Sequence, residues 1–291
     1  MTRVVSMEST PECIICCLKQ VLTTAVRITD DPLLHKKVLD SAMTYLKGQD
    51  LTITPAEIAS DLFHLTCREL QQPDPFRREM DDYNQQALKL LPKLHRILEQ
   101  SEDRILQAIL MAVAGNLIDL GIIAEVNVDE TIDSVLKTGL KVNDYPKLRE
   151  VLDKSKNLLY IADNAGEIVF DRLLLEEIKN SYPLLEMTVT VKSGPASNDA
   201  LRCDAVAAGI DQIAAIIETG AECLGIPEGR CGVEFRERFA AADVVIAKGH
   251  ANFETIVPNR RPVFVLLRAK CPIVAAELGV AVHDSVLKMY Y

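Results

Sequence analysis

The first half of the chain places hydrophobic residues at helical spacing. Between residues 33 and 46, apolar side chains recur every three or four positions, as in an amphipathic helix. Thr54 and Glu57, with a proline between them, form the pattern of an N-cap and capping box. The segment ILQAILMAVAGNLIDL (105–120) predicts a buried helix that carries a few polar residues inward. We therefore expect residues 1–150 to be helical throughout.

From about residue 157 the pattern changes to short apolar runs separated by helical stretches. These runs lack polar alternation, so they predict a parallel sheet covered by helices on both faces. The expected strands are NLLYIAD (157–163), MTVTVKS (187–193), QIAAIIE (212–218), DVVIAKG (243–249) and PVFVLLR (262–268).

Together the two patterns predict an α/β fold. We expect a doubly wound, mostly parallel, Rossmann-like sheet preceded by an N-terminal all-helical domain. The predicted division gives a helical domain in residues 1–150 and an α/β domain in residues 151–291.

The balance of charge narrows the choice of partners. The 291 residues include 32 Lys and Arg against 42 Asp and Glu, for a net charge of -10. This argues against a nucleic-acid partner, because neutralising phosphates requires clustered basic residues. No stretch approaches the roughly 20 apolar residues of a membrane helix, and no export signal is found. We expect a cytoplasmic protein without a membrane partner, and its oligomeric state stays open.

Polar clusters follow four of the expected strands. Ligands of open parallel sheets bind beyond the carboxyl ends of the strands, so these clusters should meet at one edge of the sheet. They are Asp163-Asn164-Ala165-Gly166-Glu167, Lys192-Ser193-Gly194-Pro195 with Asn198-Asp199, Glu218-Thr219-Gly220, and Lys248-Gly249-His250-Ala251-Asn252-Phe253-Glu254.

Asp163, Asn164 and Asp199 carry the oxygen atoms that hard divalent cations prefer. Gly166 lets the backbone approach a ligand, and the helix after it presents N–H groups to an anion. The structural alternative is that both aspartates are ordinary helix caps and Asn164 belongs to a turn. We predict that these three residues are catalytic and bind one ion of Mg²⁺, Mn²⁺, Co²⁺ or Ni²⁺.

Lys248 is the fourth residue predicted to be catalytic. It ends an apolar strand, where its mobile charge can reach a phosphoryl oxygen; a solvated strand-end lysine is the alternative. Asn116 and Asp119 share a helix face that either closes over the sheet edge or joins the two domains. Substrate-binding roles are predicted for Glu167, Lys192, Gly249, Asn252, Asn116 and Asp119.

Cys13 and Cys16 form a Cys-x-x-Cys motif, and Cys17 follows directly. A zinc site needs two further ligands, and a thioredoxin-like site needs a βαβ setting that this helical segment does not offer. A packed or weakly redox-sensitive pair is therefore favoured, with a shared zinc or iron site as the alternative. The glycine-rich signatures of dinucleotide, P-loop and α/β-hydrolase sites are absent.

Five motifs, in order along nearly the whole chain, resemble those of one known family. They are CIIC (13–16), AGNLIDLG (114–121), IADNAGEIVFD (161–171), VKSGPASND (191–199) and AKGHANFE (247–254). The chain resembles the damage-control phosphatases, formerly domain of unknown function 89, and within them the prokaryotic subfamily with the CxxC motif.

The resemblance implies a divalent-metal phosphatase with a helical N-terminal region and a Rossmann-like core. By motif, Asp163, Asn164 and Asp199 match the family's metal ligands, and Lys248 matches its phosphate-contacting lysine. The implied substrates are sugar phosphates, phosphopantetheine derivatives or related metabolites, often damaged ones. The CxxC pair, and the absence of an Arg-Thr-x-Lys type motif, separate this chain from the eukaryotic branches and leave its substrate open.

The resulting hypothesis is in-line attack on phosphorus by a metal-bound water, with Lys248 stabilising the phosphoryl charge. A covalent Asp163 intermediate is the rival mechanism, although the motif is Asp-Asn-Ala rather than Asp-x-Asp. S-adenosylmethionine-dependent methylation of carboxyl groups and non-catalytic binding of a metal or metabolite are the alternative functions.

Overall fold

A mostly parallel sheet forms the centre of the protein. The computed structural model describes residues 7–115, 137–256 and 261–291. Within these ranges the sheet has seven strands in the order β1-β7-β6-β5-β2-β3-β4. They are β1 (Val142–Asn143), β2 (Asn157–Ile161), β3 (Glu186–Val191), β4 (Ala215–Glu218), β5 (Val244–Lys248), β6 (Val263–Arg268) and β7 (Ser285–Tyr290).

The sheet reverses its winding direction beside β2. From β2 the chain moves outward through β3 and β4, and it then returns to place β5 and β6 on the other side of β2. All these pairings are parallel, whereas β7 runs antiparallel to β6. The carboxyl ends of β2 and β5 therefore flank a topological switch point, where open α/β sheets bind ligands.

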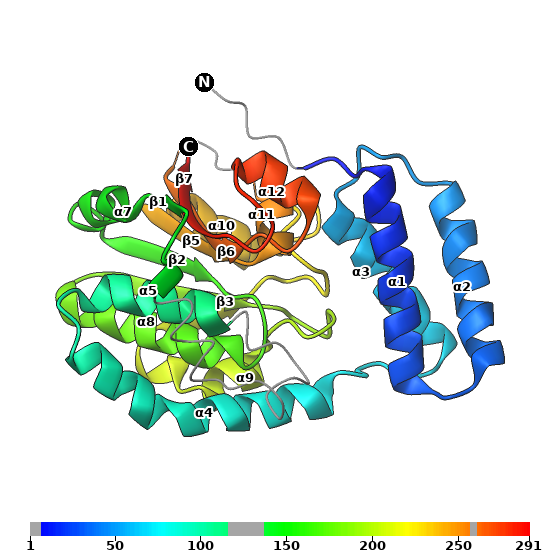
Figure 1. Ribbon diagram of the computed structural model, residues 1–291, viewed down its shortest axis with the longest axis horizontal. Helices are drawn as coiled ribbons and strands as arrows, with labels where there is room; N and C mark the ends of the chain where they lie inside the picture. Colours follow the sequence, from blue (N-terminus) through cyan, green and yellow to red (C-terminus); the bar gives the residue numbers. More distant parts are fainter. Residues whose placement is uncertain (1–6, 116–136, 257–260) are drawn as a thin grey trace.

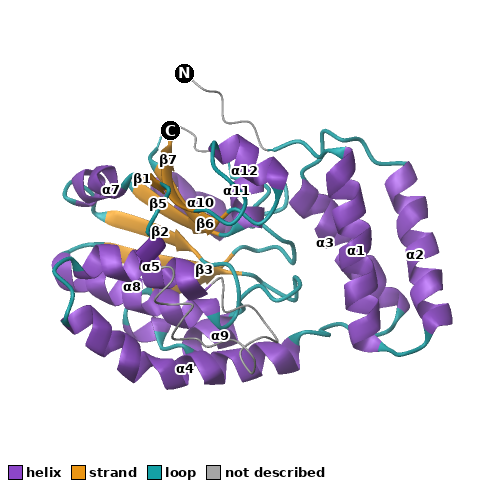
Figure 2. Ribbon diagram, in the orientation of Figure 1, coloured by secondary structure: helices purple, strands orange, loops and turns teal. Residues whose placement is uncertain are grey.

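Helices cover both faces of the sheet (Figures 1 and 2). Side chains alternate along β2, with Leu158 and Tyr160 in one core and Leu159 and Ile161 in the other. The first core includes α4 (Arg77–Glu99), α5 (Arg104–Gly115), α7 (Tyr145–Leu152), α8 (Glu167–Ser181) and α9 (Arg202–Ala207). The second includes α10 (Val233–Ala241), α11 (His250–Thr255) and α12 (Pro272–Leu278).

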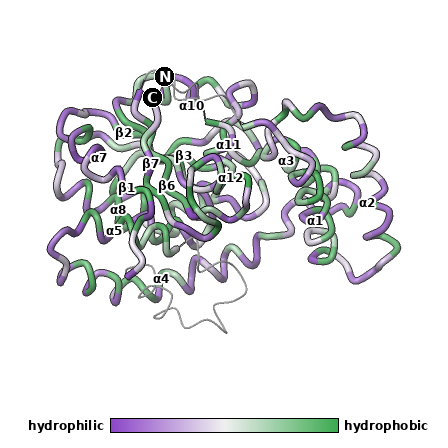
Figure 3. Tube along the Cα trace, turned by 45° about the horizontal axis from the view of Figure 1, so that its top comes forward, coloured by the Kyte–Doolittle hydropathy of each residue, from purple (hydrophilic) through white to green (hydrophobic). Residues whose placement is uncertain are grey.

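The first three helices form a separate unit with its own core. They are α1 (Pro11–Ile28), α2 (Pro32–Lys47) and α3 (Pro55–Glu69). Thr54 and Glu57 form the predicted capping box at the start of α3. In Figure 1 these helices stand to one side of the sheet, and α4 leads back beneath it. Figure 3 shows hydrophobic residues gathered along the strands and more hydrophilic ones around them.

The predicted fold class is confirmed: the five expected strands form, and the sheet is doubly wound. The expectation of helix throughout residues 1–150 is wrong at β1, a two-residue strand that pairs with β7. β7 was also not predicted. Both lie at the far edge of the sheet, where short or half-exposed strands carry a weak hydrophobic pattern.

The predicted domain boundary at residue 150 stays a prediction. The packing favours an earlier division, because α4, α5 and α7 share the core of the sheet while α1–α3 do not. At Gly115 in α5, an added Cβ would lie 2.9 Å from the Phe170 ring of α8, so these two helices pack closely. Among the described residues, no helix is both long enough and apolar enough to span a bilayer.

Candidate active site at the strand ends

The loops that follow β2 and β3 are bonded to each other. The Ala200 N–H donates to the Asp163 carbonyl at 2.8 Å, and Asn164 pairs with Asp199 in an antiparallel bridge. These backbone contacts bring two aspartates from different strand ends together. The predicted convergence of the clusters after β2 and β3 is therefore seen in the backbone itself.

Both carboxyl groups are buried. Asp163 is 7% exposed and Asp199 is 3% exposed. Burial, followed by the charges of Glu167 and Asp199, raises the pKa of Asp163 well above its usual value. Burial also raises the pKa of Asp199 to about 6, although the charge of Lys192 opposes this rise. The protein thus holds two carboxylates where their negative charges are poorly solvated and repel each other.

The oxygen atoms of this cluster fit a hard divalent cation. The Asp199 Oδ2 atom is buried and makes no hydrogen bond, and the Lys192 ammonium lies 3.4 Å away as an ion pair. The Asn164 Nδ2 donates to Asp163 Oδ2 at 2.9 Å and to Glu167 Oε2 at 3.0 Å. A cation would relieve the repulsion and occupy the unsatisfied oxygen.

The candidate ligands include an amide, so they are not a cluster of acidic, cysteine and histidine side chains alone. Over the described ranges, no three His, Cys, Asp or Glu side chains are arranged to hold a metal by themselves. The candidate set has two carboxylates and one amide, so a bound ion would take its remaining ligands from water or substrate, as Mg²⁺ commonly does. The roles of Asp163, Asn164 and Asp199 as ligands stay predictions.

Lys248 lies beneath the carboxylate cluster. Its buried ammonium donates to Glu167 Oε1 at 2.5 Å, to Asp171 Oδ1 at 2.6 Å and to the Ala112 carbonyl at 2.9 Å. All three ammonium protons are used, and the two carboxylates raise the pKa of Lys248 against the lowering effect of burial. Lys248 thus fixes Glu167, which in turn holds the Asn164 amide, and its contact with phosphate stays a prediction.

We expect Lys248→Met to lower the free energy of unfolding by about 3–5 kcal/mol, because it leaves two buried carboxylates without their cation. Urea denaturation measures this change. Lys37→Met, at an exposed lysine of α2, is the control and should stay within about 0.5 kcal/mol of the wild type. Adding Asp171→Asn to Lys248→Met should recover part of the loss. A loss below about 1 kcal/mol would show that the ion pairs of Lys248 contribute little to the free energy of unfolding.

Gly249 and Asn252 join the ends of β2 and β5. A Cβ on Gly249 would lie 2.1 Å from Asp163 Oδ2, so only glycine leaves room for the carboxylate. The buried Asn252 Nδ2 donates to the Ala162 carbonyl at 3.0 Å and to the Lys248 carbonyl at 2.6 Å. These contacts hold the two strand ends at a fixed separation across the switch point.

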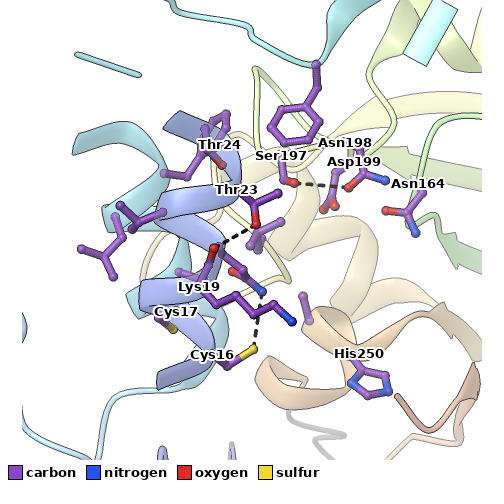
Figure 4. A pocket seen from close by; sticks show the side chains of 18 of the residues that line it. Cys16, Cys17, Lys19, Thr23, Thr24, Asn164, Ser197, Asn198, Asp199 and His250 are labelled. Atoms are coloured by element: carbon purple, nitrogen blue, oxygen red, sulfur yellow. Dashed lines mark hydrogen bonds between the residues drawn. The ribbon is translucent and has the colours of Figure 1, made fainter. Parts of the chain in front are cut away.

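A cavity of about 440 Å³ lies between α1 and the strand ends. Asp163, Asn164 and Asp199 line it on the sheet side, as do Ser197 and Asn198. Figure 4 shows Asn164, Ser197, Asn198 and Asp199 across the cavity from α1. On the helical side it is lined by Cys16, Cys17, Lys19, Gln20, Val21, Thr23, Thr24 and Arg27 of α1. Phe63 of α3, Phe76 before α4, and His250 and Lys270 complete much of the wall.

Contacts between α3 and the loop after β4 hold the helical unit over this cavity. Arg230 pairs with Asp61 at 2.6 Å, and the Leu224 N–H donates to Ser60 Oγ at 2.8 Å. The Glu254 carboxyl group also accepts a hydrogen bond from the Ala56 N–H, at the start of α3. The wall formed by α1 is thus tied to the sheet through three separate contacts.

The predicted substrate-binding residues have different positions. Glu167, Lys192, Gly249 and Asn252 are packed behind the cavity lining, where they support the lining residues. Asn116 and Asp119 lie outside the described residues. The four that the structure describes do not line the cavity, and the roles of all six in binding stay predictions.

Lys270 and the polar residues of α1 that line the cavity were not singled out from the sequence. Lys270 lies just beyond the carboxyl end of β6, so the strand-end rule could have identified it. Its charge acts on both aspartates and offsets part of the effect of burial on their pKa values. On α1, the lining residues Lys19, Thr23 and Arg27 are four apart, a spacing that places them on one helix face.

His250 lines the cavity as a neutral ring. Burial lowers its pKa to about 4, and the Lys270 N–H lies 2.9 Å from its Nε2. The ring also contacts the Arg268 carbonyl. The imidazole therefore fixes the loop after β6 and is a poor acceptor for a second proton.

The cysteine motif of α1 is divided between surface and core. Cys16 is exposed and lines the cavity, whereas burial raises the pKa of the Cys17 thiol to about 12. All eight cysteines are free thiols. The described residues bring no group of metal-binding side chains to this motif, so its shared zinc or iron site gains no support.

Comparison with known proteins finds relatives along nearly the whole chain. The family model of the damage-control phosphatase ARMT1-like domain matches residues 9–286. The chain is 35% identical to an uncharacterised protein of Methanocaldococcus jannaschii, over 97% of this chain and 95% of the relative. It is 33% identical to a damage-control phosphatase of Archaeoglobus fulgidus, over 97% of this chain and 99% of the relative.

A crystal structure of a DUF89 family protein from Pyrococcus horikoshii superposes with a TM-score of 0.87 at 32% identity. The superposition covers 97% of this chain and 98% of that protein. The likeness thus extends over the helical unit and the sheet together. On the match of both sequence and fold, the chain belongs to the family of damage-control phosphatases with an ARMT1-like domain.

Proposed function

We propose that this chain hydrolyses small phosphorylated metabolites at the cavity between α1 and the strand ends, with one divalent cation held by Asp163, Asn164 and Asp199. The observation that carries the proposal is the pair of buried carboxylates at the switch point, one of which has an oxygen without a hydrogen bond. Membership of the damage-control phosphatases supports the reaction class.

When bound, the cation would neutralise charge on the phosphoryl group and lower the pKa of a water molecule. Asp163 and Asp199 would hold the cation with carboxylate oxygens from the loops after β2 and β3, and Asn164 would add a neutral amide oxygen. Glu167 and Lys248 position the Asn164 amide from below. Lys270, on the cavity wall, is placed to attract the phosphoryl oxygens.

In the proposed reaction, water attacks phosphorus directly, without a covalent intermediate on the enzyme. Asp163 is packed against Gly249, so attack by its own carboxylate would require it to leave a closely fitted position. Hydrolysis of a substrate made chiral at phosphorus distinguishes the two routes. Inversion of configuration is expected for direct attack by water, and retention, or a trapped aspartyl phosphate at Asp163, would instead establish the covalent route. The loop after β2 has one glycine, Gly166, which gives no support to a methyltransferase site.

Removal of metal is the main test. We expect EDTA to abolish hydrolysis of p-nitrophenyl phosphate, and Mg²⁺, Mn²⁺, Co²⁺ or Ni²⁺ to restore it. The cation should also raise the Tm, because a ligand that binds only the folded state adds about 2.7 kcal/mol at a hundredfold excess over its Kd. Differential scanning fluorimetry measures this shift without relying on activity.

Two aspartate variants serve as controls for the metal test. Asp199→Asn should lose the metal-dependent rise in Tm. Asp243→Asn, at the opposite end of the sheet, should retain it. Full hydrolysis by the metal-free protein, or an equal rise in Tm for both variants, would count against a cation at Asp163, Asn164 and Asp199.

A further inference from the structure

The wall opposite the carboxylates is a polar face of α1. Cys16, Gln20, Thr23 and Arg27 follow one another at intervals of four, three and four residues, and all line the cavity. The helix also packs Ile14 and Leu18, which do not line the cavity, against the core of the helical unit. An active-site cavity with a polar far wall is suited to a substrate that is polar at both ends.

Most polar groups on this wall are already engaged. Arg27 pairs with Glu79 at 2.8 Å and lies 4.3 Å from the centre of the Phe76 ring. The Thr23 hydroxyl donates to the Lys19 carbonyl at 2.9 Å. The Lys19 ammonium, in contrast, makes no hydrogen bond or ion pair within the part of the chain that the structure describes. Figure 4 shows its side chain extending from α1 toward the strand-end residues.

The charge of Lys19 is not needed to balance the sheet side of the cavity. The buried Lys192 already pairs with Asp199, and Lys270 acts on both aspartates. The exposed Lys19 ammonium on the far wall is thus available to a charge that the ligand brings. At 440 Å³ the cavity is large enough for a metabolite rather than for phosphate alone.

We propose that Lys19 binds a second anionic group, at the end of the substrate remote from the reacting phosphate, so that this enzyme selects phosphorylated metabolites with two anionic ends. The inference rests on the proposed function for the position of the first phosphate. The second group is a carboxylate or another phosphate, since both offer the anionic oxygens that an ammonium binds. Lys19 is a specificity residue and takes no part in the chemical step.

Non-hydrolysable phosphonates test the inference by binding alone. The probes are propylphosphonate, phosphonopropionate, which adds a carboxylate, and propylene diphosphonate, which adds a second phosphonate. With saturating Mg²⁺ present, isothermal titration calorimetry should show that the wild type binds at least one of the doubly anionic probes more tightly than propylphosphonate. The preferred probe identifies the second group as a carboxylate or a phosphate.

Lys19→Ala should weaken binding of the preferred probe by about 10-fold or more, the size of one charge-assisted hydrogen bond, and should change propylphosphonate by less than about 2-fold. Lys19→Arg should restore most of the affinity. Lys37→Ala, which removes an exposed lysine of α2, should change neither.

Equal losses for all three probes in Lys19→Ala, no loss for any, or no binding to the wild type would overturn the inference. Its failure is distinguishable from failure of the proposed function, which is decided by hydrolysis of p-nitrophenyl phosphate. An active enzyme whose Lys19 variants bind every probe normally would lose only the second subsite.

Discussion

Asp163→Asn is expected to reduce kcat for p-nitrophenyl phosphate by at least about 100-fold while leaving the protein folded. The substitution keeps the shape of the side chain and removes one of the two negative charges that would hold the cation. Because burial and the neighbouring Glu167 and Asp199 disfavour the charged carboxylate, its loss should not lower the Tm of the metal-free protein. Activity and stability should therefore respond in different ways.

Asp243→Asn provides the opposite result as a control. Asp243 accepts hydrogen bonds from the Lys156 and Asn157 N–H groups, at 2.8 and 2.9 Å, where β2 begins. Its replacement should lower the Tm and leave kcat within about 2-fold of the wild type. If Asp163→Asn retained more than a tenth of the wild-type kcat, the site would have to lie elsewhere in the cavity.

The position of the carboxylate cluster could be predicted because it follows from the direction of the strands. Apolar runs without polar alternation indicated a parallel sheet, and a parallel sheet brings the residues after β2, β3, β4 and β5 to one edge. Which residues fill the core between the strands did not matter for this conclusion. Asp163 and Asp199 could thus be paired from the sequence although 36 positions separate them.

The direction of the Lys248 side chain could not be predicted in the same way. Val244 and Ile246 belong to the core under α5 and α8, and alternation along β5 sends Lys248 to that side. Its partners, Glu167 and Asp171, lie on a helix more than 75 residues earlier, and the sequence gives no sign of that contact. The local sequence around a strand-end lysine does not reveal whether its ammonium contacts solvent, substrate or a buried carboxylate.

The wall formed by α1 depends on contacts that are still more distant in the sequence. Asp61 and Arg230, which are 169 residues apart, help to hold the helical unit over the sheet. Residues 1–150 were expected to be helical, and α1 lies among them, but hydrophobic periodicity describes one element and not the neighbour that covers it. That Lys19 and the other polar residues of α1 line a cavity can be inferred only when the position of the sheet opposite them is known.

Gly249→Ala is expected to lower kcat by about 100-fold or more, although it adds only one methyl group. Its backbone has φ 77° and ψ 172°, a conformation that is nearly restricted to glycine. The new Cβ would lie 2.1 Å from Asp163 Oδ2 and 2.2 Å from its Cγ. The carboxylate must therefore move, and a shift of about 1 Å in a catalytic group can cost this much in rate. Steady-state kinetics and the Tm should be measured together.

Gly279→Ala separates the effect of the close contact from that of backbone strain. Gly279 also has positive φ, at 74°, but a Cβ there meets nothing within 4 Å. Its replacement should lower the free energy of unfolding by about 1–2 kcal/mol and leave kcat unchanged. Gly249→Ala should lower the free energy of unfolding by a comparable or larger amount, and it should lower kcat as well. If both variants kept wild-type kcat, Asp163 would tolerate displacement, and a rigid carboxylate at this switch point could not be the basis of catalysis.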